Sequence, residues 1–260
     1  MRGWSERVRL RTHAPTPRAA SLREPSGGDE LALEGVDTRA AVAFLDRLLD
    51  QGPAAGELSA SDRDGLLAAL HRGLWGDRIV SSLECAACGA PYDLAFDLSA
   101  LQRSLEAGRE PAAVIEPRLL QAGDGLRLRL PDAEAEDEAA QLGPEAGRAR
   151  LAADVAGADG ADDPELDARL ETLAPLLDVD LEAACAECGH PALARFDIQS
   201  FVLQRLLDER EGLLGEVHTL AGAYGWSLTE ILGLPRSLRR AMTERLRQAP
   251  GAGFSGGGRS

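Results

Sequence analysis

An internal repeat constrains the fold of this chain more than any other feature. A cysteine-containing segment recurs one hundred positions later with seven matching residues, six of them identical and one a conservative exchange. Alternating apolar and polar residues flank each cysteine pair, as in β-strands, and a helical pattern follows. The sequence therefore predicts a duplicated unit made of a β-hairpin and a helix. The matched residues are Cys85 with Cys185, Cys88 with Cys188, Gly89 with Gly189, Pro91 with Pro191, Phe96 with Phe196, Asp97 with Asp197, and Leu98 with Ile198.

Each copy carries the pattern Cys-x-x-Cys-Gly, here called a knuckle. Two thiols three residues apart on a tight turn point toward one place, and glycine permits a positive φ after the second sulfur. Two knuckles supply four sulfurs, the number that a tetrahedral zinc ion takes, and they use every cysteine of the chain. Four thiolates leave no open coordination position, so the sequence predicts a structural zinc ion. Its ligands would be Cys85, Cys88, Cys185 and Cys188, and replacing Cys85 or Cys188 by serine should unfold the central region.

Three other uses of the cysteines compete with zinc. A redox dithiol needs a helix N-terminus to lower a thiol pKa, and neither knuckle opens a recognisable helix. Structural disulfides are disfavoured in a cytoplasmic chain. An iron–sulfur cluster also takes four cysteines. Zinc is favoured, although the long separation of the knuckles leaves open whether they share one ion.

Hydrophobic periodicity locates the remaining elements. Helices are expected over 38–49 and from Ser59 or Ser61 to about Gly76, a strand over 126–131, and two or three helices over 198–247. Asp97 and Asp197 are interpreted as helix N-caps.

These elements predict an α+β protein with a duplicated, zinc-ribbon-like hairpin core, flanking helices and a C-terminal helical module. The predicted organisation has five parts. They are a disordered basic arm (1–28), the first helix and knuckle repeat (29–110), an acidic insertion with a short strand and helices (111–175), the second knuckle repeat with the helical module (176–247), and a disordered glycine-rich tail (248–260).

Charge narrows the choice of function. The net charge is −15, and residues 132–171 carry most of it, which disfavours a general nucleic-acid binder. This acidic segment is interpreted as a solvated insertion, with a dock for a basic partner as the alternative. All 28 basic residues are arginine, a pattern that codon bias explains without a functional demand. The absence of a long apolar run and of an apolar leader predicts a cytoplasmic protein that does not bind membranes.

No catalytic motif stands out, so the chain is predicted not to be an enzyme and to have no catalytic residues or small-molecule substrate. The four histidines are interpreted as bystanders. His13 falls in the arm, His71 on a helix surface, His190 beside a knuckle, and His218 in a helix as a hydrogen-bonded residue.

The C-terminal module contains the candidate partner surface. Tyr224, Gly225 and Trp226 form a predicted turn, followed by Ser227 as N-cap with Glu230 as its capping-box partner. A final arginine-rich helix follows Pro235. Five residues are candidates for contact with a partner protein: Tyr224, Trp226, Arg236, Arg239 and Arg240.

This module and the knuckles resemble the baseplate hub assembly chaperone family of tailed phages, in the zinc-knuckle form found with phage-tail-like contractile injection systems. The resemblance spans roughly residues 29–247 and is strongest over 196–240. Both knuckles have alanine where such members often carry proline, and the aromatic residue expected after the paired arginines is missing at Met242 and Thr243. The matching residues are Phe196, Asp197, Phe201, Glu216, His218, Leu220, Tyr224, Gly225, Trp226, Ser227, Glu230, Ile231, Leu232, Pro235, Arg239 and Arg240.

The resemblance implies a non-enzymatic structural or assembly protein whose partners are baseplate, hub or spike proteins. A zinc-ribbon adaptor for nucleic acid or the transcription apparatus is the alternative, motivated by the basic N-terminal segment and opposed by the acidic body. A redox enzyme using the cysteine pairs is a third hypothesis.

Overall fold

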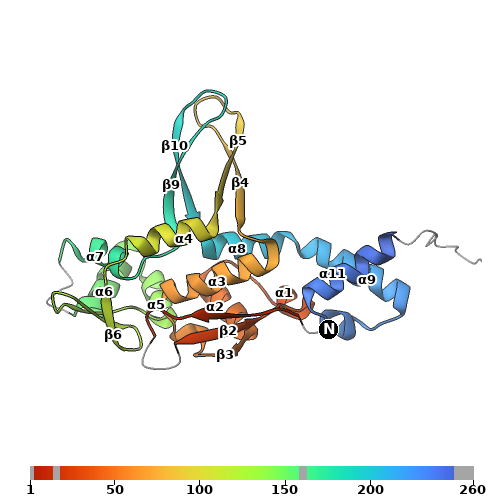
Figure 1. Cartoon of the computed structure of the whole chain (residues 1–260), viewed down its shortest axis with the longest axis horizontal. Coiled ribbons are helices and arrows are strands. Elements are labelled where there is room, and N and C mark those ends of the chain that lie inside the picture. Colours follow the sequence, from red (N-terminus) through yellow and green to blue (C-terminus); the bar gives the residue numbers. More distant parts are fainter. Residues whose placement is uncertain (1–2, 14–17, 158–162, 249–260) are drawn as a thin grey trace, which may run out of the picture.

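The computed structural model describes residues 3–13, 18–157 and 163–248. An elongated body carries a stalk of two β-hairpins on one side (Figure 1). Helix and strand are both well represented and the sheets are small and antiparallel, which confirms the α+β class. The strands are β1 (Ser5–Arg9), β2 (Ala19–Arg23), β3 (Leu49–Gln51), β4 (Arg78–Glu84), β5 (Pro91–Asp97), β6 (Ala112–Glu116), β7 (Leu119–Ala122), β8 (Arg127–Arg129), β9 (Asp178–Ala184) and β10 (Pro191–Asp197).

The helices are α1 (Gly27–Leu31), α2 (Thr38–Leu48), α3 (Ala60–Trp75), α4 (Leu98–Ala107), α5 (Ala133–Leu142), α6 (Pro144–Ala156), α7 (Leu166–Leu173), α8 (Ile198–Asp208), α9 (Arg210–Tyr224), α10 (Leu228–Leu232) and α11 (Arg236–Gln248), with a 3-10 turn at Ala55–Glu57. Helix α3 begins at the predicted cap, where the Ser59 side chain accepts a hydrogen bond from the Asp62 N–H, and it ends at Gly76. Its leucines pack with those of α2 and α8 in the main core.

The first 28 residues are not a disordered arm over their described part, and that prediction is wrong. Strands β1 and β2 pair along their whole length in a sheet with the order β1-β2-β3, and Leu22 is fully buried. The segment also lies against α3, because a Cβ at Gly73 would come within 2.6 Å of the Trp4 ring. Arginines on one strand face masked the alternation, since Arg7 and Arg9 point outward. Residues 1–2 and 14–17 lie outside the described residues.

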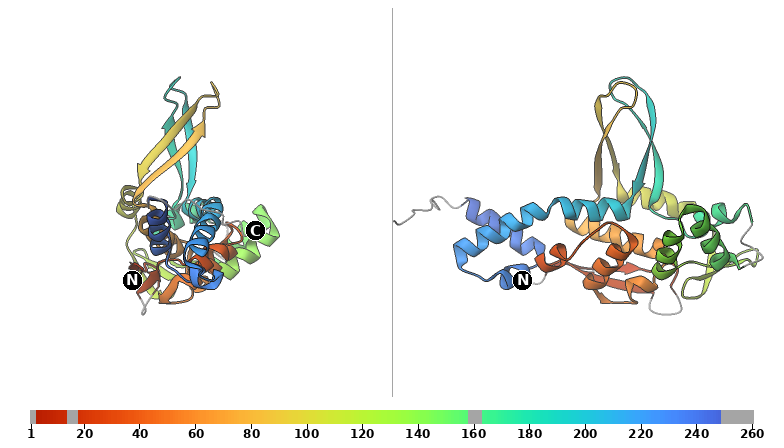
Figure 2. Two further views of the ribbon diagram at one scale, coloured as in Figure 1. Left: turned by 90° about the vertical axis from the view of Figure 1, so that its right-hand side faces the viewer. Right: turned by 180° about the vertical axis from the view of Figure 1, so that it is seen from behind.

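The two knuckle repeats form the stalk. Strands β4 and β5 pair over seven residues, as do β9 and β10, so the two hairpins correspond residue for residue. Their feet meet where Phe96 packs edge-on against Phe196, with ring centroids 5.0 Å apart. Helices α4 and α8 begin directly after the hairpins and fix them on the body. Seen from the side and from behind, both hairpins rise from the same face of the body (Figure 2).

The acidic insertion is a folded unit with its own core. It has three strands, in the order β6-β7-β8, where one was expected. A separate apolar cluster forms around Leu120, Leu128 and Leu173. The carboxylate of Glu136 pairs with Arg63, whose side chain is only 2% exposed, and so joins the insertion to the main core.

The C-terminal segment forms four helices, α8 to α11, where two or three were expected. The capping box between Ser227 and Glu230 is present at the start of α10. The predicted tail falls, from residue 249 onward, outside the described residues. None of the described helices combines the length and apolar character that a bilayer crossing requires.

Candidate metal centre

The knuckles are two copies of one backbone turn. In the first, the Cys85 N–H donates to the Ala90 carbonyl at 3.0 Å, and the Gly89 N–H donates to the Cys85 carbonyl at 2.8 Å. The second repeats both bonds, from Cys185 to His190 at 3.0 Å and from Gly189 to Cys185 at 2.9 Å. Both glycines have positive φ, +71° and +70°. The turn therefore requires the glycine that follows each cysteine pair.

All four sulfurs meet at the end of the stalk. The Sγ atoms of Cys85 and Cys188 are 3.6 Å apart, those of Cys88 and Cys185 are 3.8 Å apart, and all four lie within 4.8 Å of one another. The cysteines are free thiols, at distances well beyond a disulfide bond of about 2.05 Å. A tetrahedral ion bound at about 2.3 Å to each sulfur would place the sulfurs about 3.8 Å apart. The donor set and its spacing thus fit a four-thiolate metal site.

Backbone amides prepare the sulfurs to act as ligands. Hydrogen bonds from the Cys88 and Ala87 N–H groups lower the pKa of Cys85 to about 6. At Cys188, the His190 N–H also favours the thiolate, but the neighbouring Cys88 and Cys85 groups and burial outweigh it and raise the pKa to about 12. Four thiols packed together cannot all ionise without a cation to compensate the charge, so a bound metal would remove this conflict.

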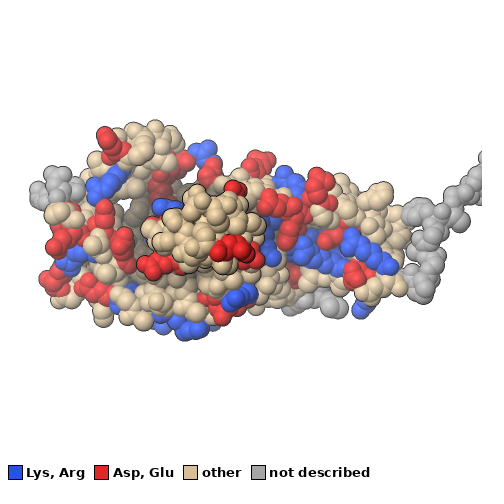
Figure 3. Space-filling model, turned by 90° about the horizontal axis from the view of Figure 1, so that it is seen from above, with Lys and Arg blue, Asp and Glu red and all other residues tan. Residues whose placement is uncertain are grey.

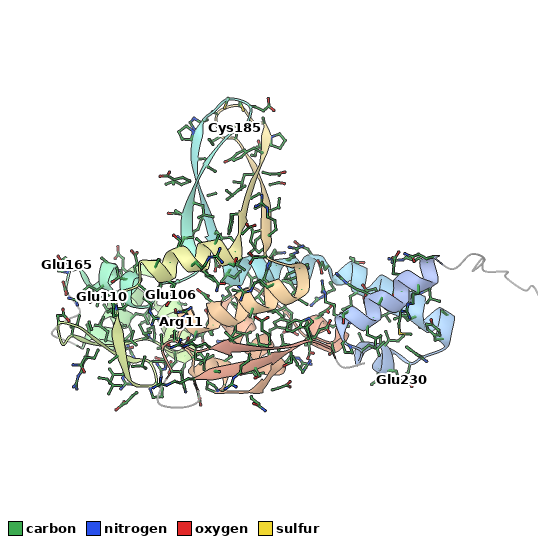
Figure 4. The ribbon with its side chains drawn as sticks, viewed as in Figure 1. Arg11, Glu106, Glu110, Glu165, Cys185 and Glu230 are labelled. Atoms are coloured by element: carbon green, nitrogen blue, oxygen red, sulfur yellow. The ribbon has the colours of Figure 1, made fainter. Side chains whose placement is uncertain are left out.

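The metal centre stands far from the main core, at the tip of the stalk (Figure 4). Its own apolar core is very small and consists of Cys85, Cys185 and Tyr92, with Leu83 and Ala183 against it. Two seven-residue hairpins with so little buried surface are marginal alone. A metal ion held by both hairpins would therefore supply most of the distal stability.

Two alternatives from the sequence, a redox dithiol and structural disulfides, gain no structural support. Each knuckle lies between two strands and so lacks the helix N-terminus that activates a redox cysteine. His190 is exposed, and four sulfurs fill a tetrahedral site without it.

The candidate partner residues divide into two groups. Tyr224 is 44% exposed and stacks on Trp226, with centroids 5.0 Å apart, and the Arg240 side chain is 43% exposed. Arg236 and Arg239 are 3% and 0% exposed, so the prediction that they contact a partner is wrong.

These two arginines instead form a buried ion-pair network. The Arg239 guanidinium donates to Glu30 at 3.0 Å and to Glu216 at 2.6 Å, and Arg236 pairs with Glu30 and Glu209. The network fixes α11 against α1 and α9. Sequence reasoning missed its glutamates because nothing local marks them: Glu30 lies 209 positions before Arg239.

Two further buried titratable groups were missed. His71 was expected on a surface but is fully buried, with its ring 5.2 Å from that of Trp75 and 5.7 Å from that of Phe201. Burial, with Arg205 nearby, lowers the pKa of His71 to about 4. Burial also raises the pKa of Asp64 to about 7, although its carboxylate accepts a hydrogen bond from the Leu177 N–H. Their apolar neighbours, rather than a ligand, explain both shifts.

Comparison with known proteins identifies no relative: no family model, no curated protein and no solved structure matches the chain.

Proposed function

We propose that this protein is a non-enzymatic structural or assembly component of the baseplate of a contractile, phage-tail-like injection system, and that one zinc ion stabilises its stalk. The observation that supports the scaffold role is the convergence of four sulfurs from two repeats one hundred residues apart. A closed four-thiolate site holds two hairpins together but offers no position for a substrate. The resemblance of the knuckles and the C-terminal module supports the baseplate assignment.

Zinc is the proposed ion because four thiolates in a tetrahedral arrangement suit it, and because a closed site needs no redox chemistry. The ion would bind Cys85, Cys88, Cys185 and Cys188. Metal analysis of the purified chain tests this assignment, and we expect one zinc ion per chain. Iron with the visible absorption of a cluster, or two ions per chain, would contradict it.

The exposed part of the C-terminal module is the proposed contact with hub, spike or other baseplate proteins. The rings of Tyr224 and Trp226 stack on each other, Leu228 two residues further along is exposed, and the Arg240 side chain on α11 is also accessible. Exposed aromatic side chains are typical anchors of protein interfaces.

Co-expression with the proteins encoded by the neighbouring genes tests the baseplate role, which requires sheath, tube, hub or spike proteins among them. We expect the chain to co-purify with at least one of them, and the variant Tyr224→Ala/Trp226→Ala to lose that partner. Leu142→Ala is the matched control, because Leu142 is a similarly exposed apolar residue on the insertion. Neighbouring genes of another kind, or retention of the partner by the double variant, would argue against the proposal.

The nucleic-acid adaptor finds little support in the stalk. Residues 79–96 and 179–194, which include both knuckles, contain no arginine or lysine but do contain five acidic residues. From above, uncharged atoms cover most of the stalk tip, with acidic atoms at its margin (Figure 3). This distal part of the stalk has no cations with which to neutralise phosphates. A shift of labelled DNA or RNA at moderate salt would favour this alternative.

A further inference from the structure

A pocket at the junction of the body and the insertion has a charge opposite to that of the protein. It encloses about 600 Å³ and is lined by four arginines, a histidine and only two carboxylates. In a chain with a net charge of −15, this concentration of cations needs a physical reason. The charged and titratable lining residues are Arg9, Arg11, Arg18, Arg109, His13, Glu106 and Glu110.

The arginines come from three segments that the fold brings together. Arg9 and Arg11 point to the same side of the first strand and its extension, and Arg18 begins the return segment. Arg109 follows α4, and its Nε donates to the Leu173 carbonyl at 2.9 Å. The Arg11 N–H donates a hydrogen bond to the Asp62 carboxylate at 2.6 Å, which fixes the end of the strand that lines the pocket. The guanidinium groups are thus held on rigid elements.

The carboxylates do not neutralise this group. Glu106 pairs with Arg11 and lies 3.7 Å from Arg109, so it positions two guanidinium groups (Figure 4). Glu110 is the second acid in the lining. The Arg9 side chain makes no ion pair or hydrogen bond with any described residue. Arg9, Arg11 and Arg109 alone outnumber the two glutamates, so positive charge remains inside the pocket.

A buried donor or acceptor in the pocket also lacks a partner. His13 is 7% exposed, and its Nδ1 is buried without a hydrogen-bond partner among the described residues. A buried polar atom of this kind costs free energy unless a ligand satisfies it. Apolar lining residues, among them Leu10, Pro111 and Val114, complete the pocket and suit an organic group.

We propose that this pocket binds a phosphate group, as the ester of a small molecule. A guanidinium group can donate two parallel hydrogen bonds to two oxygens of a phosphate group. A phosphate ester can carry two negative charges and so compensates more of the positive charge in the pocket than a ligand with one carboxylate would. The volume lies within the range of small-molecule sites and exceeds the needs of inorganic phosphate alone. The site is independent of the stalk and of the proposed baseplate role.

Calorimetric titration of the full chain with inorganic phosphate, phenyl phosphate and phenol tests the proposal. We expect phenyl phosphate to bind at one site, more tightly than inorganic phosphate, and phenol not to bind. Arg9→Gln should weaken binding of phenyl phosphate about tenfold, since a charge-assisted hydrogen bond is lost. Arg127→Gln is the matched control, because Arg127 is exposed, forms no ion pair among the described residues and does not line the pocket.

Circular dichroism of both variants checks that they remain folded. Equal binding of the two phosphates would show that free phosphate is the ligand and that the ester group adds nothing. The proposal is overturned if no phosphate compound binds at about 10 mM, which corresponds to a free energy of only about −3 kcal/mol. Equal weakening by Arg9→Gln and Arg127→Gln, or binding of phenol as tight as that of phenyl phosphate, would also overturn it.

Discussion

His71 shows at the residue scale how burial couples stability to pH. Its native pKa is about 4, whereas the free imidazole titrates near 6.5. Between these values the unfolded chain binds more protons, so the free energy of unfolding rises with pH. His71→Leu removes this dependence and two ring nitrogens that have no hydrogen-bond partner among the described residues. The free energy of unfolding of the variant should therefore exceed that of the wild type by the largest amount near pH 4.5. This difference should shrink by about 1.4 kcal/mol per pH unit up to pH 6.5.

Urea unfolding followed by tryptophan fluorescence at several pH values measures this difference. Asp64→Asn is the control with the opposite sign. Because burial raises the pKa of Asp64 to about 7, the wild-type carboxylate loses native stability as pH rises toward that value. The asparagine variant should therefore gain on the wild type with rising pH. If the free energy of unfolding of both variants depended on pH in the same way as that of the wild type, neither group would have the shifted pKa that its burial predicts.

Arg239 carries the second prediction at this scale. Its side chain is fully buried and pairs with Glu30 and Glu216. Removing one partner of a buried ion pair leaves uncompensated charge, so Arg239→Met should lower the free energy of unfolding by about 3 kcal/mol. Arg247→Met, on the same helix but exposed, should change it by less than about 0.5 kcal/mol. Chemical denaturation compares the two, and similar losses would mean that the network contributes little.

At the scale of elements, features that depend on residues close in sequence could be predicted, and features that depend on residues far apart in sequence could not. The caps at Ser59 and Ser227 and both knuckle turns depend on residues within a few positions, and the structure confirms the helices and strands around them. Strands β1 and β2 escaped prediction because arginine and serine fill their exposed faces. The role of Arg239 escaped because its partner Glu30 belongs to another part of the chain. The four sulfurs meet because the repeats are equivalent, which the sequence did show.

The stalk is the element in which metal binding should act. Its distal core is separate from the main core, so the expectation that a cysteine replacement unfolds the central region needs revision. Cys185→Ser should abolish hydrogen-exchange protection in β4, β5, β9 and β10 and leave α2 and α3 protected. Chelation of the wild-type metal should reproduce this pattern. Loss of protection in α3 would show that the body depends on the metal as well.

At the scale of the whole molecule, the insertion separates the two repeats in the sequence but not in space. Its two ends meet, because the Glu110 N–H donates to the Thr172 carbonyl at 2.8 Å. The insertion also has its own apolar cluster. The metal centre therefore depends on the body that holds α4 and α8, and only the distance between the ends of the insertion has to be preserved.

Replacing residues 111–171 by a short Gly-Ser linker tests this independence. We expect the shortened chain to fold and to bind one metal ion per chain. The reason is that the entropic cost of joining the two ends through a short flexible linker differs little from that of the wild-type connection. Its melting temperature should fall, since Arg63 loses the Glu136 carboxylate in a buried position. Adding Arg63→Met to the shortened chain should recover part of that loss. Cobalt substitution reports the site through the absorption of a tetrahedral four-thiolate centre, and a folded shortened chain that lacks this absorption would mean that the insertion helps to align the hairpins.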